Sequence, residues 1–118
     1  MKNYGEARAY LYSLHKRGIK MGLRNMRIMC RIFGNPQKKF RSVHVAGTNG
    51  KGSVACYTAS VLRLQGYKTG LYTSPHLLDY TERILVNEDP ITRDEILELA
   101  NYVRSEEHTS ELQSLAYL

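Results

Sequence analysis

The sequence has 118 residues, enough for one domain of ordinary size, and its 42% hydrophobic and 24% charged residues are a globular balance. No apolar run approaches the roughly 20 residues that a membrane span needs, and no apolar segment follows residues 1–6 as in a secretory signal. The two cysteines, Cys30 and Cys56, are too few for a disulfide framework, which favours a reduced, cytoplasmic setting.

The charge balance favours an anionic partner. Seventeen Lys and Arg against eleven Asp and Glu leave a net charge of +6. The last fifteen residues hold one Arg and three Glu, so the excess of positive charge belongs to residues 1–103. A nucleotide, a nucleic acid or a polyanionic substrate would suit this charge equally well.

Two helices are predicted first along the chain. Over residues 4–17, apolar residues recur every three or four positions, and residues 22–33 repeat this pattern with a methionine-rich stripe that we expect in the core. The stripe consists of Met26, Met29, Cys30 and Phe33. The second helix should stop at residues 34–36, Gly-Asn-Pro, because Pro cannot continue a helix.

A strand–helix–strand unit should follow. Residues 42–46 form a β-branched run that predicts a strand, in which His44 should be packed in the interior. Residues 52–65 return to helical periodicity, and residues 68–73 are a second strand candidate. Such a βαβ unit implies parallel strands. Beyond it we expect a loop over 74–78, a short extended piece over 83–86, and a helix from about residue 93. The last begins with a capping box at residues 92–95.

The strongest chemical signal is the glycine-rich turn of residues 47–53. It leaves a predicted strand and opens a predicted helix, so its backbone N–H groups can surround an anion. Lys51 supplies a positive charge suited to the β- and γ-phosphates of a nucleotide. The strict P-loop pattern is not met, because position 45 is Val and position 52 is Gly. A plain tight turn with a surface lysine is the alternative; three glycines together with Asn49 favour a phosphate cradle.

Several motifs in collinear order resemble one family. They are GIKMGLRNM, FGNPQKKF, HVAGTNGKGS, GYKTGLYTSPHL and ER-I-VN-PI. Together they resemble folylpolyglutamate synthase/dihydrofolate synthase, a branch of the Mur ligase family, over about residues 4–103. The resemblance implies an α/β fold: an N-terminal helical segment (1–40) and the truncated start of a P-loop-type parallel sheet, the partial ATP-binding Mur ligase domain (41–103).

The resemblance also implies a reaction. Family members are ATP-dependent amide ligases that add L-glutamate to folate, convert dihydropteroate to dihydrofolate, or do both, with Mg²⁺ as the metal cofactor. ATP phosphorylates the acceptor carboxylate, and the amine of L-glutamate then attacks the acyl phosphate. Such catalysis depends on positioning and charge neutralisation. The resemblance implies no nucleic-acid partner and no membrane partner, and it leaves the oligomeric state open.

Site residues follow from the same resemblance, position by position. It assigns ATP binding to the glycine-rich turn, with Lys51 as the catalytic cation: Gly47, Thr48, Asn49, Gly50, Lys51, Gly52 and Ser53. Ser74 matches a Mg²⁺ ligand, as suits a hard oxygen donor. His76 is a candidate for contacting substrate; the alternative is a plain surface-loop histidine. Gly22 and Leu23 are secondary candidates for the pterin site, next to Arg24, where the family often has an acidic residue.

The last residues should be a non-native tail. Residues 104–114, RSEEHTSELQS, resemble one reading frame of a sequencing-library adaptor, so residues 104–118 are excluded from functional reasoning. The family's downstream Mg²⁺ ligands, modified lysine and C-terminal domain are not found in the 118 residues. We therefore expect the chain by itself to be inactive and only marginally folded.

Two other functions remain open at this stage. A Mur-type ligase acting on a cell-wall precursor would share the glycine-rich turn, although the TSPHL and GNPQ segments argue against it. A non-enzymatic basic module that binds nucleotides or nucleic acid would suit the charge. Against this function, the sequence has no aromatic residues interleaved with Lys and Arg, and no helix-turn-helix or zinc-ligand spacing.

Overall fold

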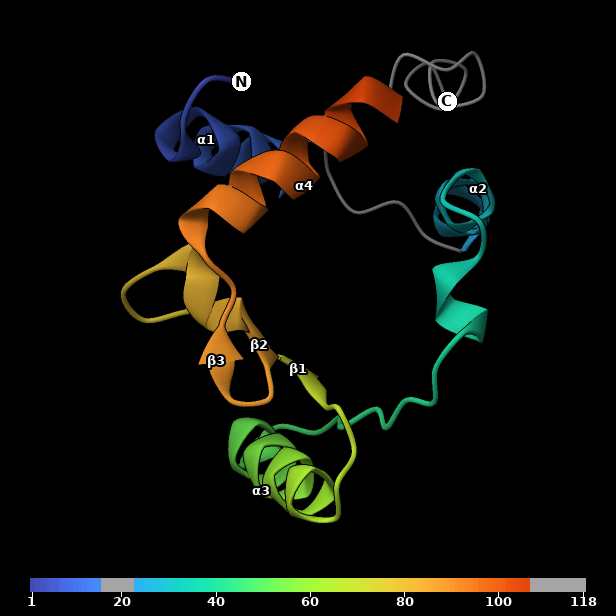
Figure 1. Cartoon of the computed structure of the whole chain (residues 1–118), viewed down its shortest axis with the longest axis vertical. Coiled ribbons are helices and arrows are strands. Elements are labelled where there is room, and N and C mark those ends of the chain that lie inside the picture. The colour runs from blue at the N-terminus through green and yellow to red at the C-terminus, as the bar shows by residue number, and fades with distance from the viewer. Residues whose placement is uncertain (16–22, 107–118) are drawn as a thin grey trace. The chain divides into compact units, whose positions relative to one another are not determined.

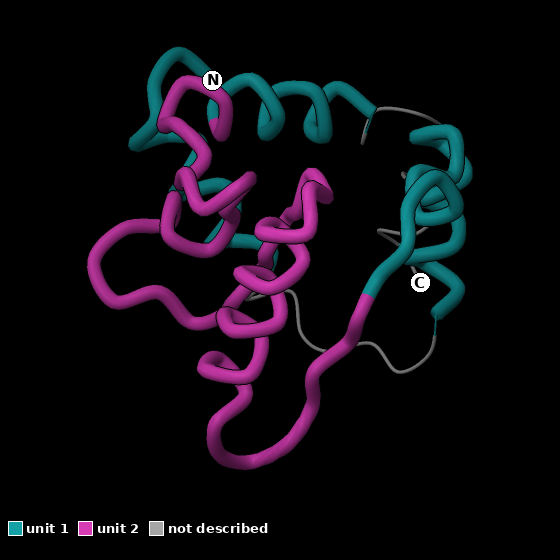
Figure 2. The backbone as a smooth tube through the Cα atoms, turned by 60° about the horizontal axis from the view of Figure 1, so that its bottom comes forward, with its two compact units in different colours: residues 1–42, 97–118 teal, residues 43–96 magenta. Residues whose placement is uncertain are grey.

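The computed structural model describes residues 1–15 and 23–106, which form four α-helices, two short 3₁₀ helices and three strands (Figure 1). In chain order they are α1 (Tyr4–His15), α2 (Arg24–Ile32), η1 (Pro36–Lys38), α3 (Lys51–Leu64), β1 (Gly70–Tyr72), η2 (Tyr80–Arg83), β2 (Ile84–Val86), β3 (Asp89–Pro90) and α4 (Arg93–Glu106). The chain divides into two compact units, residues 1–42 with 97–118 and residues 43–96 (Figure 2). Within the described residues, no helix has the length and apolar character that a membrane crossing requires.

The first unit is helical. At the start of α1, the Asn3 side chain accepts from the Glu6 N–H (2.9 Å) and the Glu6 carboxylate accepts from the Lys2 N–H (2.8 Å), a reciprocal cap of the helix N-terminus. The N-terminal ammonium of Met1 donates to Asn101 Oδ1 at 2.7 Å, which ties the start of the chain to α4. These bonds hold the first and last described segments together.

The predicted end of α2 is confirmed, whereas the methionine-rich stripe that we expected in the core is only partly buried. Gly34 (φ 78°) and Asn35 (φ 54°) take left-handed conformations, and the Asn35 N–H bonds the Cys30 carbonyl at 2.6 Å. Phe33 lies 5.3 Å from the Tyr102 ring of α4. No residue of α2 is fully buried, and Met26 is 59% exposed. Residues 24–32 therefore form a surface helix whose methionine-rich side is only partly covered.

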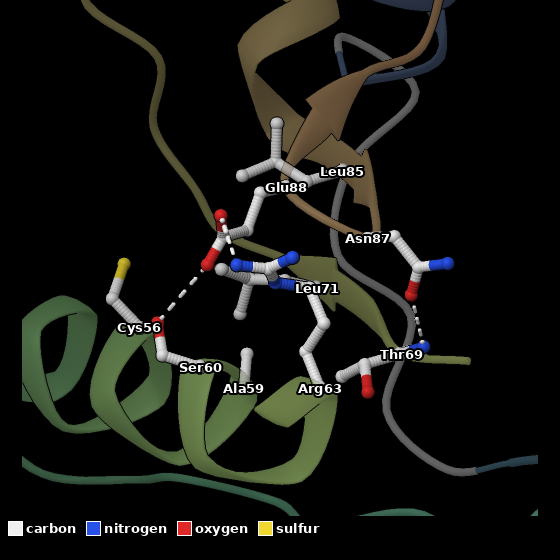
Figure 3. Close-up of a pocket in the computed structure, with 9 residues that line it drawn as sticks. All are labelled: Cys56, Ala59, Ser60, Arg63, Thr69, Leu71, Leu85, Asn87 and Glu88. Atoms are coloured by element: carbon white, nitrogen blue, oxygen red, sulfur yellow. Dashed lines mark hydrogen bonds and ion pairs between the residues drawn. The ribbon is translucent and has the colours of Figure 1, made fainter. Parts of the chain in front are cut away.

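The second unit is built on an antiparallel sheet in the order β1-β2-β3. Leu71 pairs with Leu85 between β1 and β2, and Val86 pairs with Asp89 between β2 and β3. Helix α3 packs on β1. Figure 3 shows Ala59 of α3 facing Leu71 and Leu85 across a small pocket. At its edge Arg63 pairs with Glu88 at 2.9 Å, so helix and sheet are joined by an apolar centre and a charged rim.

The structure corrects the predicted parallel unit. Residues 42–46 form no strand, and His44, which we expected in the interior, is exposed along with Val43. A strand exists only where a neighbour completes its hydrogen-bond ladder, and no described strand lies beside this segment. Strand β1 pairs with β2 in antiparallel fashion instead. The chain is therefore α/β, with a small antiparallel sheet.

Helix positions agree better with the sequence pattern. The predicted helices over 52–65 and from 93 onward correspond to α3 and α4, and the predicted 68–73 strand contains β1. The capping box of α4 forms as expected, with the Thr92 N–H bonding the Glu95 carboxylate at 2.8 Å and the Glu95 N–H bonding Thr92 Oγ1 at 3.1 Å. On α3, two apolar residues of this periodic pattern, Val54 and Val61, are more than half exposed.

The small core makes one side chain decisive for stability. Ile96 of α4 is only 3% exposed, whereas Leu99 on the same helix is 51% exposed. We expect Ile96→Ala to lower the free energy of unfolding by about 2–4 kcal/mol, since it leaves a cavity, and Leu99→Ala to lower it by less than about 1 kcal/mol. Urea titrations followed by far-UV circular dichroism would measure both. Equal losses in the two variants would contradict this assignment of the core.

Candidate functional site

The glycine-rich turn ends at the start of α3. Gly47 (φ 152°) and Gly50 (φ 76°) both have positive φ, and Gly50 takes the left-handed conformation as the N-cap of the helix. No side chain caps this N-terminus. Because the first N–H groups of a helix lack partners within the helix, the start of α3 offers donors and partial positive charge to an anion.

The turn has room and charge for phosphate. A Cβ atom placed on Gly50 or Gly52 would meet no heavy atom within 4 Å. Lys51 is exposed, and its Nζ reaches the Thr48 carbonyl at 3.4 Å, a long bond that a phosphate oxygen could replace. The residues present therefore fit a polyphosphate, which an uncapped helix start, open space beside two glycines and one lysine would hold together.

A second candidate segment is the loop between β1 and β2, which contains Ser74 and His76. The loop is closed at its base, where the Thr73 N–H donates to the Arg83 carbonyl at 3.0 Å next to the Tyr72–Ile84 pair. Ser74 is exposed and His76 is half-buried. Sequence reasoning named both residues, and the structure brings them into one closed loop.

Glu82 organises this loop from within. Its carboxylate accepts the backbone N–H groups of Leu77 (3.0 Å), Leu78 (2.9 Å) and Asp79 (2.8 Å). These bonds lower the pKa of Glu82 below its ordinary value because they favour the charged form, and the bond from Leu77 has the largest effect. Asp79 completes a capping box with Glu82 at the start of η2. The loop is therefore shaped by its own acidic residues.

Arg83 is a buried residue beside the candidate loop that sequence reasoning missed. It is only 8% exposed; its Nε donates to His76 Nδ1 at 2.8 Å, and its guanidinium carbon lies 4.7 Å from the centre of the Tyr80 ring. Because Nδ1 accepts, the proton of a neutral His76 ring would lie on Nε2. The only available signal was the ER pair of the quoted motif, which gave no indication of burial.

The structure gives less support to the remaining candidates, Ser74, Leu23 and Gly22. Ser74 is a single oxygen donor, and the described residues contain no cluster of three His, Cys, Asp or Glu that could hold a metal. One hydroxyl fits Mg²⁺ only as part of a shell that phosphate oxygens and water complete. Leu23 precedes α2 and is 62% exposed, while Gly22 lies outside the described residues.

Known proteins with similar sequences are named for folylpolyglutamate synthase activity, dihydrofolate synthase activity or both. The chain is 40% identical to the dihydrofolate synthase/folylpolyglutamate synthase of Bacillus subtilis over 114 residues, which is 97% of this chain and 26% of that protein. It matches the structure of folylpolyglutamate synthetase from Lactobacillus casei with a TM-score of 0.85 and 36% identity, over 95% of this chain and 28% of the other. The chain belongs to the folylpolyglutamate synthase/dihydrofolate synthase family.

The match concerns one part of these longer proteins. The chain spans about a quarter of the length of the relatives from Bacillus subtilis and Lacticaseibacillus casei and corresponds to an N-terminal stretch of them. A scan against protein-family models finds no match. A folylpolyglutamate synthase complex with AMPPCP and folate matches with a TM-score of 0.82 and 35% identity, over 95% of this chain and 28% of the other. That relative thus binds an ATP analogue and a folate.

Acid should open the β1–β2 loop through Glu82. Since its pKa is lowered in the folded state from 4.5, its contribution to stability is present above pH 4.5 and is lost as the pH falls through the lowered value. We expect the amide proton resonances of Leu77, Leu78 and Asp79 to move together in this acidic range in NMR spectra. In Glu82→Gln this shared transition should vanish; its persistence would assign it to another group.

Gly52 offers a way to separate folding from binding. It lies in the first turn of α3, where Ala is intrinsically preferred, so Gly52→Ala should raise the free energy of unfolding by about 0.5–1 kcal/mol. The added methyl would occupy the open space beside the turn, so affinity for AMPPCP should fall several-fold. Thermal unfolding and calorimetric titration would measure the two effects. Unchanged or improved AMPPCP affinity would place the phosphates elsewhere.

Proposed function

We propose that this chain supplies the nucleotide-binding part of an ATP-dependent ligase that joins L-glutamate to a folate or to dihydropteroate. The observation that carries the proposal is the uncapped start of α3, where Gly50 and Gly52 leave open space beside Lys51. The relatives' names and the AMPPCP–folate complex of one of them support the substrates.

In the proposed reaction, residues 47–53 hold the phosphates of ATP. Lys51 neutralises charge on the β- and γ-phosphates, and the N–H groups at the start of α3 fix their position. A carboxylate oxygen of the acceptor attacks the γ-phosphorus, and the bond to the bridging oxygen breaks to release ADP. The amine of L-glutamate then attacks the carbonyl carbon of the acyl phosphate. Inorganic phosphate leaves with the bonding electrons, and the nitrogen loses a proton to give the amide.

The β1–β2 loop is proposed to serve the metal and the acceptor. Mg²⁺, when bound, would supply charge neutralisation at the phosphates, and the Ser74 hydroxyl would be one of its ligands. His76, held by Arg83, would contact the acceptor. Gly22 and Leu23 would belong to the pterin site.

We propose three segments along the chain. Residues 1–40 form the helical segment, residues 41–103 belong to the ATP-binding domain, and residues 104–118 are a non-native tail. The described helix α4 continues to Glu106, so its last turn includes the first residues of that tail. The unpaired cysteines Cys30 and Cys56 support a reducing, cytoplasmic compartment for the protein.

Lys51 provides the direct test. We expect Lys51→Gln to weaken AMPPCP binding by the 118-residue chain at least about tenfold in calorimetric titrations, because a charge-assisted contact to phosphate is lost. Lys68→Gln removes the same charge from another exposed lysine of the same unit and should change the affinity less than about twofold. Equal losses in the two variants would mean that general charge, rather than the turn, attracts the nucleotide.

The acceptor distinguishes the proposed ligase from its relatives in cell-wall synthesis. Saturation-transfer NMR with the AMPPCP-loaded chain should detect dihydropteroate or folate in preference to a UDP-linked peptide. Preference for the UDP-linked peptide would overturn the folate assignment and keep the ligase class. We expect no glutamate-dependent ADP release from this chain alone.

A further inference from the structure

Arg83 is a buried cation whose charge has no role in the proposed reaction. The residue is only 8% exposed, although arginine is seldom buried unless it is paired. Its Nε donates to His76 Nδ1 at 2.8 Å, and its guanidinium carbon lies 4.7 Å from the centre of the Tyr80 ring. The His76 and Tyr80 rings are themselves 5.7 Å apart. The guanidinium group is therefore held in a fixed position by a small aromatic cluster.

The outer edge of this guanidinium group is unbonded. Among the described residues, the bond to His76 is the only hydrogen bond from the Arg83 side chain, and Arg83 forms no ion pair. Its two Nη groups carry N–H donors only, and neither group is fully shielded from solvent. The small exposed part of this side chain thus includes the donors with which arginine binds carboxylates.

The acidic residues of the same loop are engaged elsewhere. The Glu82 carboxylate accepts three backbone N–H groups of the loop, and Asp79 pairs with Arg93 at 3.4 Å. Neither carboxylate therefore compensates the charge of Arg83. A guanidinium group that is largely removed from water attracts an anion more strongly than an exposed one, because less solvent competes with the anion and screens the charge.

The backbone and the side chain of Arg83 are both attached to the loop that contains Ser74. The Thr73 N–H donates to the Arg83 carbonyl at 3.0 Å, which fixes the backbone beside the residue that precedes Ser74. The side chain is fixed by His76, two residues after Ser74. An anion bound to the Nη groups would therefore lie beside the loop that the proposed function assigns to the metal and the acceptor.

We propose that the Nη groups of Arg83 bind a substrate carboxylate, an inference that rests on the proposed function. A guanidinium group offers two parallel N–H donors to the two oxygens of a carboxylate, and these charge-assisted bonds fix both its position and its orientation. The proposed reaction supplies two sources of this group, the acceptor and L-glutamate. Bound to Arg83, the acceptor would have its attacking oxygen oriented, and L-glutamate would have its amine oriented.

A purely structural role for Arg83 is the competing explanation. It accounts for the contacts with His76 and Tyr80, which join η2 to the loop. A structural arginine that is this deeply buried also bonds backbone carbonyls or carboxylates with its Nη groups, because buried polar groups without partners cost free energy. Within the described part of the chain, Arg83 makes no such bond. The open Nη edge is thus explained by a ligand and not by the fold.

The test compares a carboxylate with its uncharged analogue. In calorimetric titrations of the AMPPCP-loaded 118-residue chain, we expect dihydropteroate to bind at least about tenfold more tightly than its carboxamide. Arg83→Lys keeps the charge but loses the two parallel donors, so it should remove most of this difference and leave carboxamide binding unchanged. Arg93→Lys makes the same change at an exposed arginine of the same unit and should alter both affinities less than about twofold.

L-glutamate is titrated in the same way to identify the source of the carboxylate. If L-glutamate supplies it, Arg83→Lys should weaken L-glutamate binding about tenfold, while dihydropteroate and its carboxamide bind equally well. The Arg83 Nε–H resonance in NMR spectra gives a second measurement that needs no stable variant. In the wild type this resonance should shift when the bound carboxylate is added, and it should not shift when the carboxamide is added.

The outcomes separate this inference from the proposed function. Equal binding of dihydropteroate and its carboxamide, together with L-glutamate binding that Arg83→Lys leaves unchanged, would overturn the inference and leave the nucleotide site standing. An Arg83 Nε–H resonance that shifts with inorganic phosphate but with neither carboxylate would overturn it in favour of a phosphate ligand. Loss of AMPPCP binding by the wild type would instead refute the proposed function.

Discussion

The pairing of β1 with β2 is the constraint on which residues 43–96 depend. Each strand is only three residues long, yet the pairing presents Leu71 and Leu85 side by side to α3 and closes the loop that carries Ser74 and His76. Two strands this short are not stable alone, so α3 must cover their apolar side. The element that carries the glycine-rich turn is thus the same element that stabilises the sheet.

Much of this arrangement follows from local patterns in the sequence. The periodicity of α3 and α4, the Gly-Asn stop after α2 and the capping box at Thr92 depend on neighbouring residues, and each forms as expected. Interpretations that needed a distant partner fared worse. Residues 42–46 have strand-like composition but no ladder partner in the described chain, so His44 is exposed. Periodicity predicts which residues share a face and does not show what covers that face.

The candidate site divides along the same line. The glycine-rich turn could be inferred because its chemistry belongs to consecutive residues and to the helix start that follows them. Arg83 could not, because its role depends on the loop folding back to bring His76 to within 2.8 Å of its guanidinium. Glu82 likewise acts through backbone N–H groups, which no side-chain pattern reveals. The positions of Ser74 and His76 in one loop were visible in the motif, but the means of holding them were not.

The β2–β3 turn carries a consequence for the order of folding. Its two central residues, Asn87 (φ 50°) and Glu88 (φ 73°), both take left-handed conformations, for which glycine rather than glutamate is preferred at the second position. The turn is therefore locally frustrated, and its compensation comes from elsewhere: Glu88 binds Ser60 and Arg63 of α3, and Asn87 bonds Thr69 before β1. The turn is thus held from outside, by α3 through Glu88 and by the segment before β1 through Asn87. We expect the turn to close only when both α3 and the segment before β1 are in place.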